Sequence, residues 1–328
     1  MLVAMEPVRW GILSTARINA ALIPGLKGSP DSELIAVASR TEERAAAYAR
    51  EWAIARAHGS YEALLADPEI EAIYISLPNG QHVDWSIRAL EAGKHVLCEK
   101  PLARLPQDVE RAFDEAERAD RLLMEAFMWR HHPQSKRLRE LVDGGAIGEL
   151  RLVRASFSFP LGDPDDIRLD PALGGGALMD VGCYCVSGSR LLAGEPVTAS
   201  ALHVPAPKGV DVRLAGTLVF PGGVLAQLDC ALDLPDRQGL EVVGSEASLH
   251  VAMPWAIEEA GIELRRGDEV EWIEIEQADR YRLQTDNFSR AVRGVEPPLL
   301  GREDALGQAR TIDALYRSAE HGGEPVAV

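Results

Sequence analysis

The sequence has no long hydrophobic run and no surplus of positive charge. No stretch approaches the about 18 uninterrupted apolar residues of a membrane span, and residues 1–7 lack the pattern of a signal peptide. Lys and Arg number 34 against 51 Asp and Glu, which gives a formal net charge of −17. Because nucleic acids and anionic membranes are bound by basic surfaces, we expect neither as a partner.

Cysteine is also scarce, and its spacing matches no metal site. The four cysteines include Cys183 and Cys185, which flank a single residue and fit neither C-x-x-C nor any zinc-ligand pattern. We therefore expect no bound metal, and reduced, mostly buried thiols of the kind found in cytoplasmic proteins.

The first part of the chain alternates short apolar runs with amphipathic stretches. The whole chain has 328 residues, more than one compact core usually holds, so two domains are expected. The alternation in residues 1–127 predicts βαβ units and a doubly wound parallel sheet of the Rossmann type. Strands are expected at 8–13, 34–39, 72–76, 95–98 and 122–127, with helices at 18–26, 42–52, 82–92 and 106–119.

Residues 128–328 follow a different pattern, in which strand-like segments succeed one another with turns between them. Strands are expected at 150–159, 197–204, 212–220, 224–232, 240–243, 248–251, 261–265 and 270–275, and helices at 134–142, 178–192, 281–292 and 303–319. This order predicts an α+β domain with a large, mostly antiparallel and open-faced sheet.

The turn after the first predicted strand lies where a dinucleotide-binding loop belongs. It reads Gly11-Ile12-Leu13-Ser14-Thr15-Ala16-Arg17-Ile18-Asn19, with Ser14, Ala16 and Asn19 at the three glycine positions of the usual fingerprint. Small residues at 14 and 16 still let a pyrophosphate approach the helix N-terminus, where backbone N–H groups attract anions. Residues 14–18 are therefore candidate cofactor ligands, although a plain strand–helix turn explains them equally well.

The second predicted strand ends in residues that bear on the choice of cofactor. An NAD enzyme normally has Asp or Glu here for the ribose 2′-hydroxyl, whereas Arg accommodates the 2′-phosphate of NADP. This chain has Arg40, with Ser39 before it and Arg44 one helical turn later, which favours NADP and leaves NAD as the alternative. The same residues also fit a helix start in which Thr41 is the cap and Arg40 is solvated.

Two further strand ends carry polar or charged side chains. The strand at 72–76 leads into Ser76-Leu77-Pro78-Asn79, with His82 opening the next helix, and these residues are candidate cofactor ligands. Asn79 is placed to meet a cofactor ribose or nicotinamide, and the alternative for His82 is a surface residue of the first helical turn. The buried run at 95–98 is followed by Glu99, Lys100 and Pro101. Ligands of open α/β sheets bind outside the carboxyl ends of the strands, so Lys100 is placed for chemistry; the alternative is a surface lysine in a turn.

These residues together resemble the glucose–fructose oxidoreductase/inositol dehydrogenase family of nicotinamide-dependent oxidoreductases. The run Glu99-Lys100-Pro101 is the most specific motif, and Ala126-Phe127-Met128-Trp129-Arg130 extends the match to the domain junction. A third motif, Gly174-Gly175-Gly176-Ala177-Leu178-Met179-Asp180-Val181-Gly182-Cys183-Tyr184, lies in the second half. Many members have His at the last position; Tyr184 resembles the branch of dihydrodiol and NADP-dependent xylose dehydrogenases.

The resemblance implies hydride transfer between the nicotinamide and a hydroxyl-bearing carbon of a cyclic diol or of an aldose such as xylose or glucose. Asp180 and Tyr184 are spaced i, i+4 and would share one face of a helix. The Tyr184 phenol needs a nearby cation to accept a proton near neutrality, and Lys100 would supply it or bind the substrate itself. We expect Lys100 within hydrogen-bond reach of the Tyr184 hydroxyl or of a ligand between them; packing of Tyr184 in the second core is the alternative.

The same resemblance assigns binding roles and an assembly. It implies that Glu99, Trp129 and Arg130 lie near the cofactor, that Trp129 lines the substrate pocket, and that Asp180 orients a sugar hydroxyl. On the strand at 150–159, Phe157 and Phe159 alternate with Ser156 and Ser158; Phe157 is a further substrate candidate, and the sequence leaves open which of the two faces lines the cleft. It also implies a homodimer or homotetramer through the outer face of the second sheet, for which a solvated face is the alternative. A catalytically silent sugar sensor on the same fold is the rival function, and retention of Lys100, Asp180 and Tyr184 argues against it.

Overall fold

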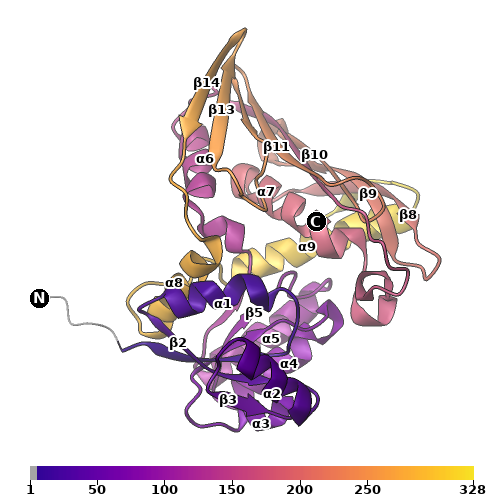
Figure 1. The fold of residues 1–328 in the computed structure, drawn as a ribbon. Helices are drawn as coiled ribbons and strands as arrows, with labels where there is room; N and C mark the ends of the chain where they lie inside the picture. Colours follow the sequence, from indigo (N-terminus) through magenta and orange to yellow (C-terminus); the bar gives the residue numbers. More distant parts are fainter. Residues whose placement is uncertain (1–5) are drawn as a thin grey trace, which may run out of the picture. The chain divides into compact units, whose positions relative to one another are not determined.

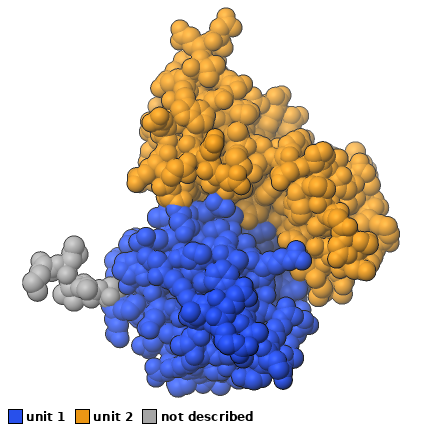
Figure 2. Space-filling view, in the orientation of Figure 1, with its two compact units in different colours: residues 1–103, 107–128, 279–306 blue, residues 104–106, 129–278, 307–328 orange. Residues whose placement is uncertain are grey.

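The computed structural model describes residues 6–328, which form two compact units (Figures 1 and 2). The first unit comprises residues up to 103, 107–128 and 279–306, and the second comprises 104–106, 129–278 and 307–328. Residues 279–306, which the sequence analysis assigned to the second domain, therefore pack with the first unit.

The first unit is built on a six-stranded parallel sheet with the order β3-β2-β1-β4-β5-β6, which confirms the doubly wound fold. Strand order reverses between β1 and β4, and in such sheets the crevice at the carboxyl ends of these strands binds ligands. The strands are β1 (Val8–Leu13), β2 (Ser32–Ala38), β3 (Arg56–His58), β4 (Ala72–Ile75), β5 (His95–Cys98) and β6 (Leu123–Glu125).

Helices connect these strands, as the alternating pattern predicted. They are α1 (Asn19–Gly28), α2 (Glu42–Glu51), α3 (Tyr61–Leu65), α4 (His82–Glu91) and α5 (Pro106–Ala119), with a short 3₁₀ helix at Asn79–Gln81. Every residue of β4 is buried, because helices cover both faces of a central parallel strand. This explains why the strand appears in the sequence as a continuous apolar run.

Helix α8 (Arg280–Val292) completes the first unit from the far end of the chain. The indole N–H of Trp10 donates to the Ser289 hydroxyl at 3.1 Å, and the rings of Trp10 and Phe288 lie 5.4 Å apart. Gly25 of α1 lets the two helices touch, since a Cβ there would lie 2.7 Å from the backbone nitrogen of Arg282. Contacts with residues this distant in sequence explain why the sequence pattern alone assigned the helix to the other domain.

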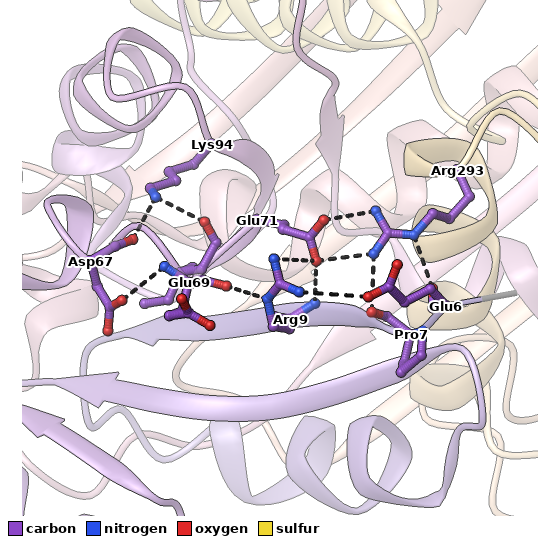
Figure 3. Close-up of polar contacts among 9 residues, drawn as sticks. Glu6, Pro7, Arg9, Asp67, Glu69, Glu71, Lys94 and Arg293 are labelled. Atoms are coloured by element: carbon purple, nitrogen blue, oxygen red, sulfur yellow. Dashed lines mark hydrogen bonds and ion pairs between the residues drawn. The ribbon is translucent and has the colours of Figure 1, made fainter.

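Arg293, the residue after α8, joins this helix to the starts of β1 and β4 through an arginine–carboxylate pair (Figure 3). Arg293 donates to both oxygens of Glu71, at 2.8 and 3.0 Å, and to the carbonyls of Glu6 and Pro7. The backbone N–H of Arg9 also donates to Glu71, at 3.1 Å. This cluster lies at the amino ends of β1 and β4, opposite to the ligand-binding edge.

The second unit contains a nine-stranded sheet with the order β14-β13-β12-β11-β7-β10-β9-β8-β15. Only the β7–β10 pair is parallel among the described strand pairs, which confirms a mostly antiparallel sheet. The strands are β7 (Leu150–Ser158), β8 (Thr198–Pro205), β9 (Asp211–Val219), β10 (Leu225–Ala231), β11 (Arg237–Gly244), β12 (Ser248–Val251), β13 (Gly261–Arg266), β14 (Glu269–Glu274) and β15 (Val326–Ala327).

One face of this sheet is covered by helices and the other is open. The helical segments are α6 (Pro133–Asp143), a π-helical turn (Leu178–Gly182) that continues into α7 (Cys183–Ala193), α9 (Arg302–Glu320), and 3₁₀ turns at Met128–His131, Ile167–Leu169, Pro171–Leu173 and Pro221–Gly223. A Cβ at Gly216 would lie 2.9 Å from Leu315 of α9, so Gly216 faces the helices. Side chains alternate along a strand, so Leu214 and Leu218 share that buried face and Thr217 points to the open one.

Candidate active site

The carboxyl ends of β1 and β4 are joined by a buried network of hydroxyl and amide groups. The hydroxyls of Ser14 and Ser76 lie 2.8 Å apart, and Ser76 donates to the side-chain oxygen of Asn19 at 2.7 Å. Asn19 in turn donates to the Ser14 carbonyl at 3.0 Å. Two predicted cofactor residues are thus brought together, and Asn19, the third fingerprint position, holds them.

The loop between β1 and α1 has the geometry of an anion site. Ser14 has a φ of +136°, a conformation usually reserved for glycine, and its hydroxyl accepts a hydrogen bond from the backbone N–H of Ala16 at 3.2 Å. The chain then enters α1, where the backbone N–H groups of Asn19, Ala20 and Ala21 donate to the carbonyls of the turn before it at 2.9–3.2 Å. Small side chains beside the positive end of a helix dipole fit a pyrophosphate.

The end of β2 supplies cations next to this loop. The Arg44 guanidinium donates to the Thr15 hydroxyl at 2.9 Å, and Thr41 accepts from the backbone N–H of Arg44 as the cap of α2. Burial raises the pKa of Tyr61, whereas the charges of Arg40 and Arg44 lower it, so both cations lie near this ring. Arg40 itself is exposed, which agrees with both interpretations of the sequence.

His82 lies deeper than the sequence suggested. It is fully buried, and its Nδ1 and Nε2 lie 2.9 Å from the Pro101 carbonyl oxygen and 2.8 Å from that of Leu77. Burial lowers the pKa of His82, although both contacts favour the charged ring. The residue bridges the segments that follow β4 and β5, and we therefore do not propose it as a direct cofactor ligand.

The Glu99 carboxylate is positioned within the first unit. Its Oε1 accepts a hydrogen bond from the buried Tyr74 hydroxyl at 2.5 Å, and its Oε2 accepts one from the backbone N–H of Lys100 at 3.3 Å. Burial, together with the charge of Glu99, raises the pKa of Tyr281 to about 12, while Arg280 and Lys100 oppose this rise. Tyr281, at the start of α8, therefore lies near the Glu99–Lys100 pair.

The remaining nucleotide candidates occupy the same edge of the sheet or its surface. Arg17 is exposed and Ile18 precedes α1, Ser39 is buried after β2, and Pro78 and Asn79 lead from β4 into α4; the peptide bond between Lys100 and Pro101 is cis. Their contacts with a cofactor stay predictions.

In the second unit Asp180 lies on the π-helical turn before α7. Its Oδ2 accepts a hydrogen bond from the Arg168 guanidinium at 2.7 Å, and Arg168 also contacts Asp166 at 3.3 Å. Burial lowers the pKa of Arg168, but the two carboxylates outweigh this and raise it. The guanidinium therefore neutralises part of the charge at Asp180, a partner that the sequence analysis missed.

Tyr184 lies on α7 inside a group of aromatic rings. Its ring centre is 5.5 Å from Phe157 and 6.0 Å from Trp255, and Trp255 packs edge-on against Trp129 at 4.9 Å. A Cβ at Gly188 would lie 2.6 Å from Trp255, so this glycine admits the indole to the helix. The structure therefore brings Trp129, Phe157 and Tyr184 together and adds Trp255, which the sequence analysis did not single out.

Trp129, which packs against these rings, carries a buried polar group. Its side chain is 1% exposed, yet within residues 6–328 its indole N–H meets no hydrogen-bond acceptor. The neighbouring Arg130 lies 5.8 Å from the Trp129 ring centre and donates to the Ser187 hydroxyl of α7 at 3.3 Å. A buried donor without an acceptor fits the recognition of a polar ligand such as a sugar.

All four cysteines are buried thiols. In the described part of the chain no three or more His, Cys, Asp or Glu side chains gather as a metal site would require. None of its helices combines the length and the apolar character needed to cross a membrane.

Comparison with known proteins identifies related sequences for both units. A family model described as an oxidoreductase family with an NAD-binding Rossmann fold matches residues 8–127, and the GFO/IDH/MocA C-terminal domain matches residues 135–250. The chain is 42% identical to a D-xylose 1-dehydrogenase (NADP(+)) of Haloferax volcanii over 95% of this chain and 98% of the relative. It is 36% identical to a trans-1,2-dihydrobenzene-1,2-diol dehydrogenase of Danio rerio, over 74% of each.

Solved structures give the same picture. A 3-ketoreductase from Actinomadura kijaniata, in complex with NADP and TDP-benzene, has a TM-score of 0.90 and 33% identity over 95% of this chain and 98% of that one. An aldose–aldose oxidoreductase from Caulobacter crescentus, complexed with glycerol, has a TM-score of 0.92 and 28% identity over 98% of this chain and all of that one.

Proposed function

Because the chain belongs to the GFO/IDH/MocA family of oxidoreductases, we propose that it is an NADP-dependent dehydrogenase of a sugar or a cyclic diol. Aldoses such as xylose or glucose are the first candidates, since the xylose dehydrogenase relative is 42% identical over nearly the full length. The observation that carries the substrate class is the aromatic cluster of Tyr184, Phe157, Trp255 and Trp129. Its Trp129 N–H is buried without an acceptor, and the carboxylate of Asp180 lies four residues before Tyr184 in the chain.

The first unit supplies a fitting nucleotide site. The loop at Ser14 to Ile18 opens toward a helix N-terminus, and Arg40 and Arg44 place positive charge beside it, as a 2′-phosphate requires. When bound, NADP supplies the hydride acceptor. Glu99, held by Tyr74, and Arg130 are the other side chains that we assign to the cofactor side.

Tyr184 and Lys100 share the proton transfer in this proposal. As the substrate hydroxyl is oxidised, Tyr184 in its phenolate form accepts the hydroxyl proton and becomes a phenol. The ammonium group of Lys100 stabilises the phenolate before this transfer or binds the hydroxyl directly. Asp180 orients a second hydroxyl of the substrate, while the Arg168 guanidinium offsets part of the negative charge of Asp180. The approach of Lys100 to Tyr184 joins residues of two units and stays a prediction.

A substrate panel tests this proposal. Purified protein is mixed with NADP and a series of aldoses, cyclitols and diols, and the absorbance of the reduced cofactor is followed. We expect turnover with at least one of them, and Tyr184→Phe should lower kcat by roughly 100- to 10,000-fold with little change in NADP affinity. Tight NADP binding without turnover on any substrate would instead favour the sensor function. Activity that survives in Tyr184→Phe would make Lys100 or water the proton acceptor.

We further propose that a second copy of the chain covers the open sheet face. That face holds a hollow of about 720 Å³, lined by paired charges such as Arg154–Glu241 and by Leu202, which is 62% exposed. Charges of both signs and an exposed apolar side chain suit a two-fold, self-complementary interface. Light scattering at micromolar concentration should give a dimer or tetramer, and Leu202→Asp should shift it toward the monomer. A monomeric wild-type protein contradicts this assembly.

The buried, free cysteines fit a cytoplasmic enzyme.

A further inference from the structure

A buried carboxylate supports the helical turn that carries Asp180. Asp211, the first residue of β9, is 3% exposed. Its Oδ2 accepts a hydrogen bond from the backbone N–H of Leu178 at 2.7 Å, and its Oδ1 accepts one from the Tyr316 hydroxyl at 2.8 Å. The first N–H groups of a helix have no partner within it, and a carboxylate there satisfies one and interacts favourably with the helix dipole.

The glycine-rich motif is shaped to admit this carboxylate. Gly176 has a φ of +123°, and a Cβ there would lie 2.2 Å from Oδ1 of Asp211 and 2.9 Å from the Tyr316 hydroxyl. The carbonyl of Gly176 accepts the backbone N–H of Asp180 at 2.9 Å. Asp211 therefore contacts the chain on both sides of the position where the turn to Asp180 begins.

Tyr316 is itself held from its other side. The Arg104 guanidinium lies 4.3 Å from the centre of the Tyr316 ring and pairs with Glu320 at 3.0 Å and Asp313 at 3.6 Å, both on α9. Burial and the Asp211 charge raise the pKa of Tyr316 well above its usual value, while Arg104 opposes the rise. The phenol therefore stays protonated and remains a donor to Asp211.

We propose that Asp211 and Tyr316 are positioning residues for the reaction, which fix Leu178 and thereby the π-helical turn and the start of α7. Asp180 lies on that turn and Tyr184 is the second residue of α7, so a shift at Leu178 would be passed to both. The inference rests on the proposed function of Asp180 and Tyr184, and neither Asp211 nor Tyr316 itself touches the substrate.

Three variants test this positioning role. Asp211→Ala removes the acceptor of the Leu178 N–H, Asp211→Asn retains an oxygen at the same place without the charge, and Tyr316→Phe removes only the second contact. We expect kcat to fall roughly 10- to 100-fold in Asp211→Ala, because a displacement of about 1 Å at a catalytic group has such an effect. NADP affinity should change less than about twofold, and Asp211→Asn should recover most of the activity.

Hydrogen exchange provides a readout that does not depend on turnover. Amide exchange in a peptide covering residues 176–184 should accelerate at least about tenfold in Asp211→Ala but stay near wild type in Asp211→Asn. Asp143→Asn is the matched control, because this carboxylate is exposed on α6 and pairs with Arg139 of the same helix. It should change neither exchange in 176–184 nor kcat.

The outcomes separate this inference from the proposed function. Wild-type kcat together with unchanged exchange in Asp211→Ala would overturn the positioning role. If no substrate is turned over by the wild type, the proposed function fails, yet the exchange measurement still tests the contact with Leu178. If Asp211→Ala does not fold, Tyr316→Phe provides the test. A smaller loss of kcat with faster amide exchange in residues 176–184 supports the positioning role, and wild-type values of both quantities overturn it.

Discussion

At position 14, a glycine substitution should leave the protein more stable than an alanine substitution, which is the reverse of the usual order. Its φ of +136° is strained for any residue with a Cβ, at a cost of about 1–3 kcal/mol. Its hydroxyl meets the Ser76 hydroxyl at 2.8 Å and the Ala16 N–H at 3.2 Å. Ser14→Ala and Ser14→Gly both lose these contacts, but only glycine relieves the strain.

The magnitude follows from these terms. Two lost hydrogen bonds cost about 2 kcal/mol in either variant. Glycine relieves about 2 kcal/mol of backbone strain, but the added freedom of the unfolded chain costs about 0.7 kcal/mol. Ser14→Ala should therefore be destabilised by about 2 kcal/mol and Ser14→Gly by about 0.7 kcal/mol, so that glycine exceeds alanine by about 1.3 kcal/mol.

Calorimetry of the wild type and the two variants under identical conditions measures this order. A difference of about 1.3 kcal/mol corresponds to roughly 3–5 °C in the transition of a unit of this size, with Ser14→Gly melting above Ser14→Ala. Elsewhere in a chain alanine is the more stable residue by about 0.5–1 kcal/mol. A melting temperature of Ser14→Ala equal to or above that of Ser14→Gly would refute the strain argument.

Two other predictions concern the first unit. Arg40→Asp should shift the ratio of kcat/KM values from NADP toward NAD by at least about tenfold, and an unchanged ratio would mean that the 2′-phosphate is bound elsewhere. Burial alone would raise the pKa of Glu71, but hydrogen bonds from Arg293 and Arg9 outweigh it and hold the pKa below its usual value. Glu71 therefore contributes stability above its unfolded pKa of about 4.3, and this is lost as pH falls through the lower folded value. Glu71→Gln should lower the melting temperature at pH 7, with a gap that narrows toward pH 3; a gap independent of pH would contradict this.

The sequence predicts the large elements of both units because their hydrophobic patterns are strong. Strands β4 and β5 appear as continuous apolar runs since helices cover both faces of the sheet. Strand β3 and the five-residue helix α3 went unpredicted, because Arg56–His58 is too short and too polar to show any period.

The site was predictable only where its residues follow strand ends or match a motif. Ser14 and Ser76 follow β1 and β4, so their meeting follows from the topology. Arg168, the partner of Asp180, lies in the 3₁₀ turn at Ile167–Leu169, and Asp211, the partner of Leu178, is the first residue of β9. No periodicity of the sequence connects these pairs. The sequence makes His82 a candidate cofactor residue, with a surface residue of a first helical turn as the alternative, because only the folded chain brings the Pro101 carbonyl to its ring.

The return of α8 to the first unit affects the order of events during synthesis. The ribosome completes β6 near residue 125, but Ser289 of α8 and Arg293 just after it, the partners of Trp10 and Glu71, emerge only after about 165 further residues have been made. At typical synthesis rates this interval lasts roughly 10–30 s, during which the nascent parallel sheet lacks one covering helix. The second unit lies later in the chain, yet strands β7 to β14 of its sheet are all synthesised before α8 can complete the first unit. The N-terminal half of this protein is thus finished nearly last, and chaperone contacts should concentrate on it during that interval.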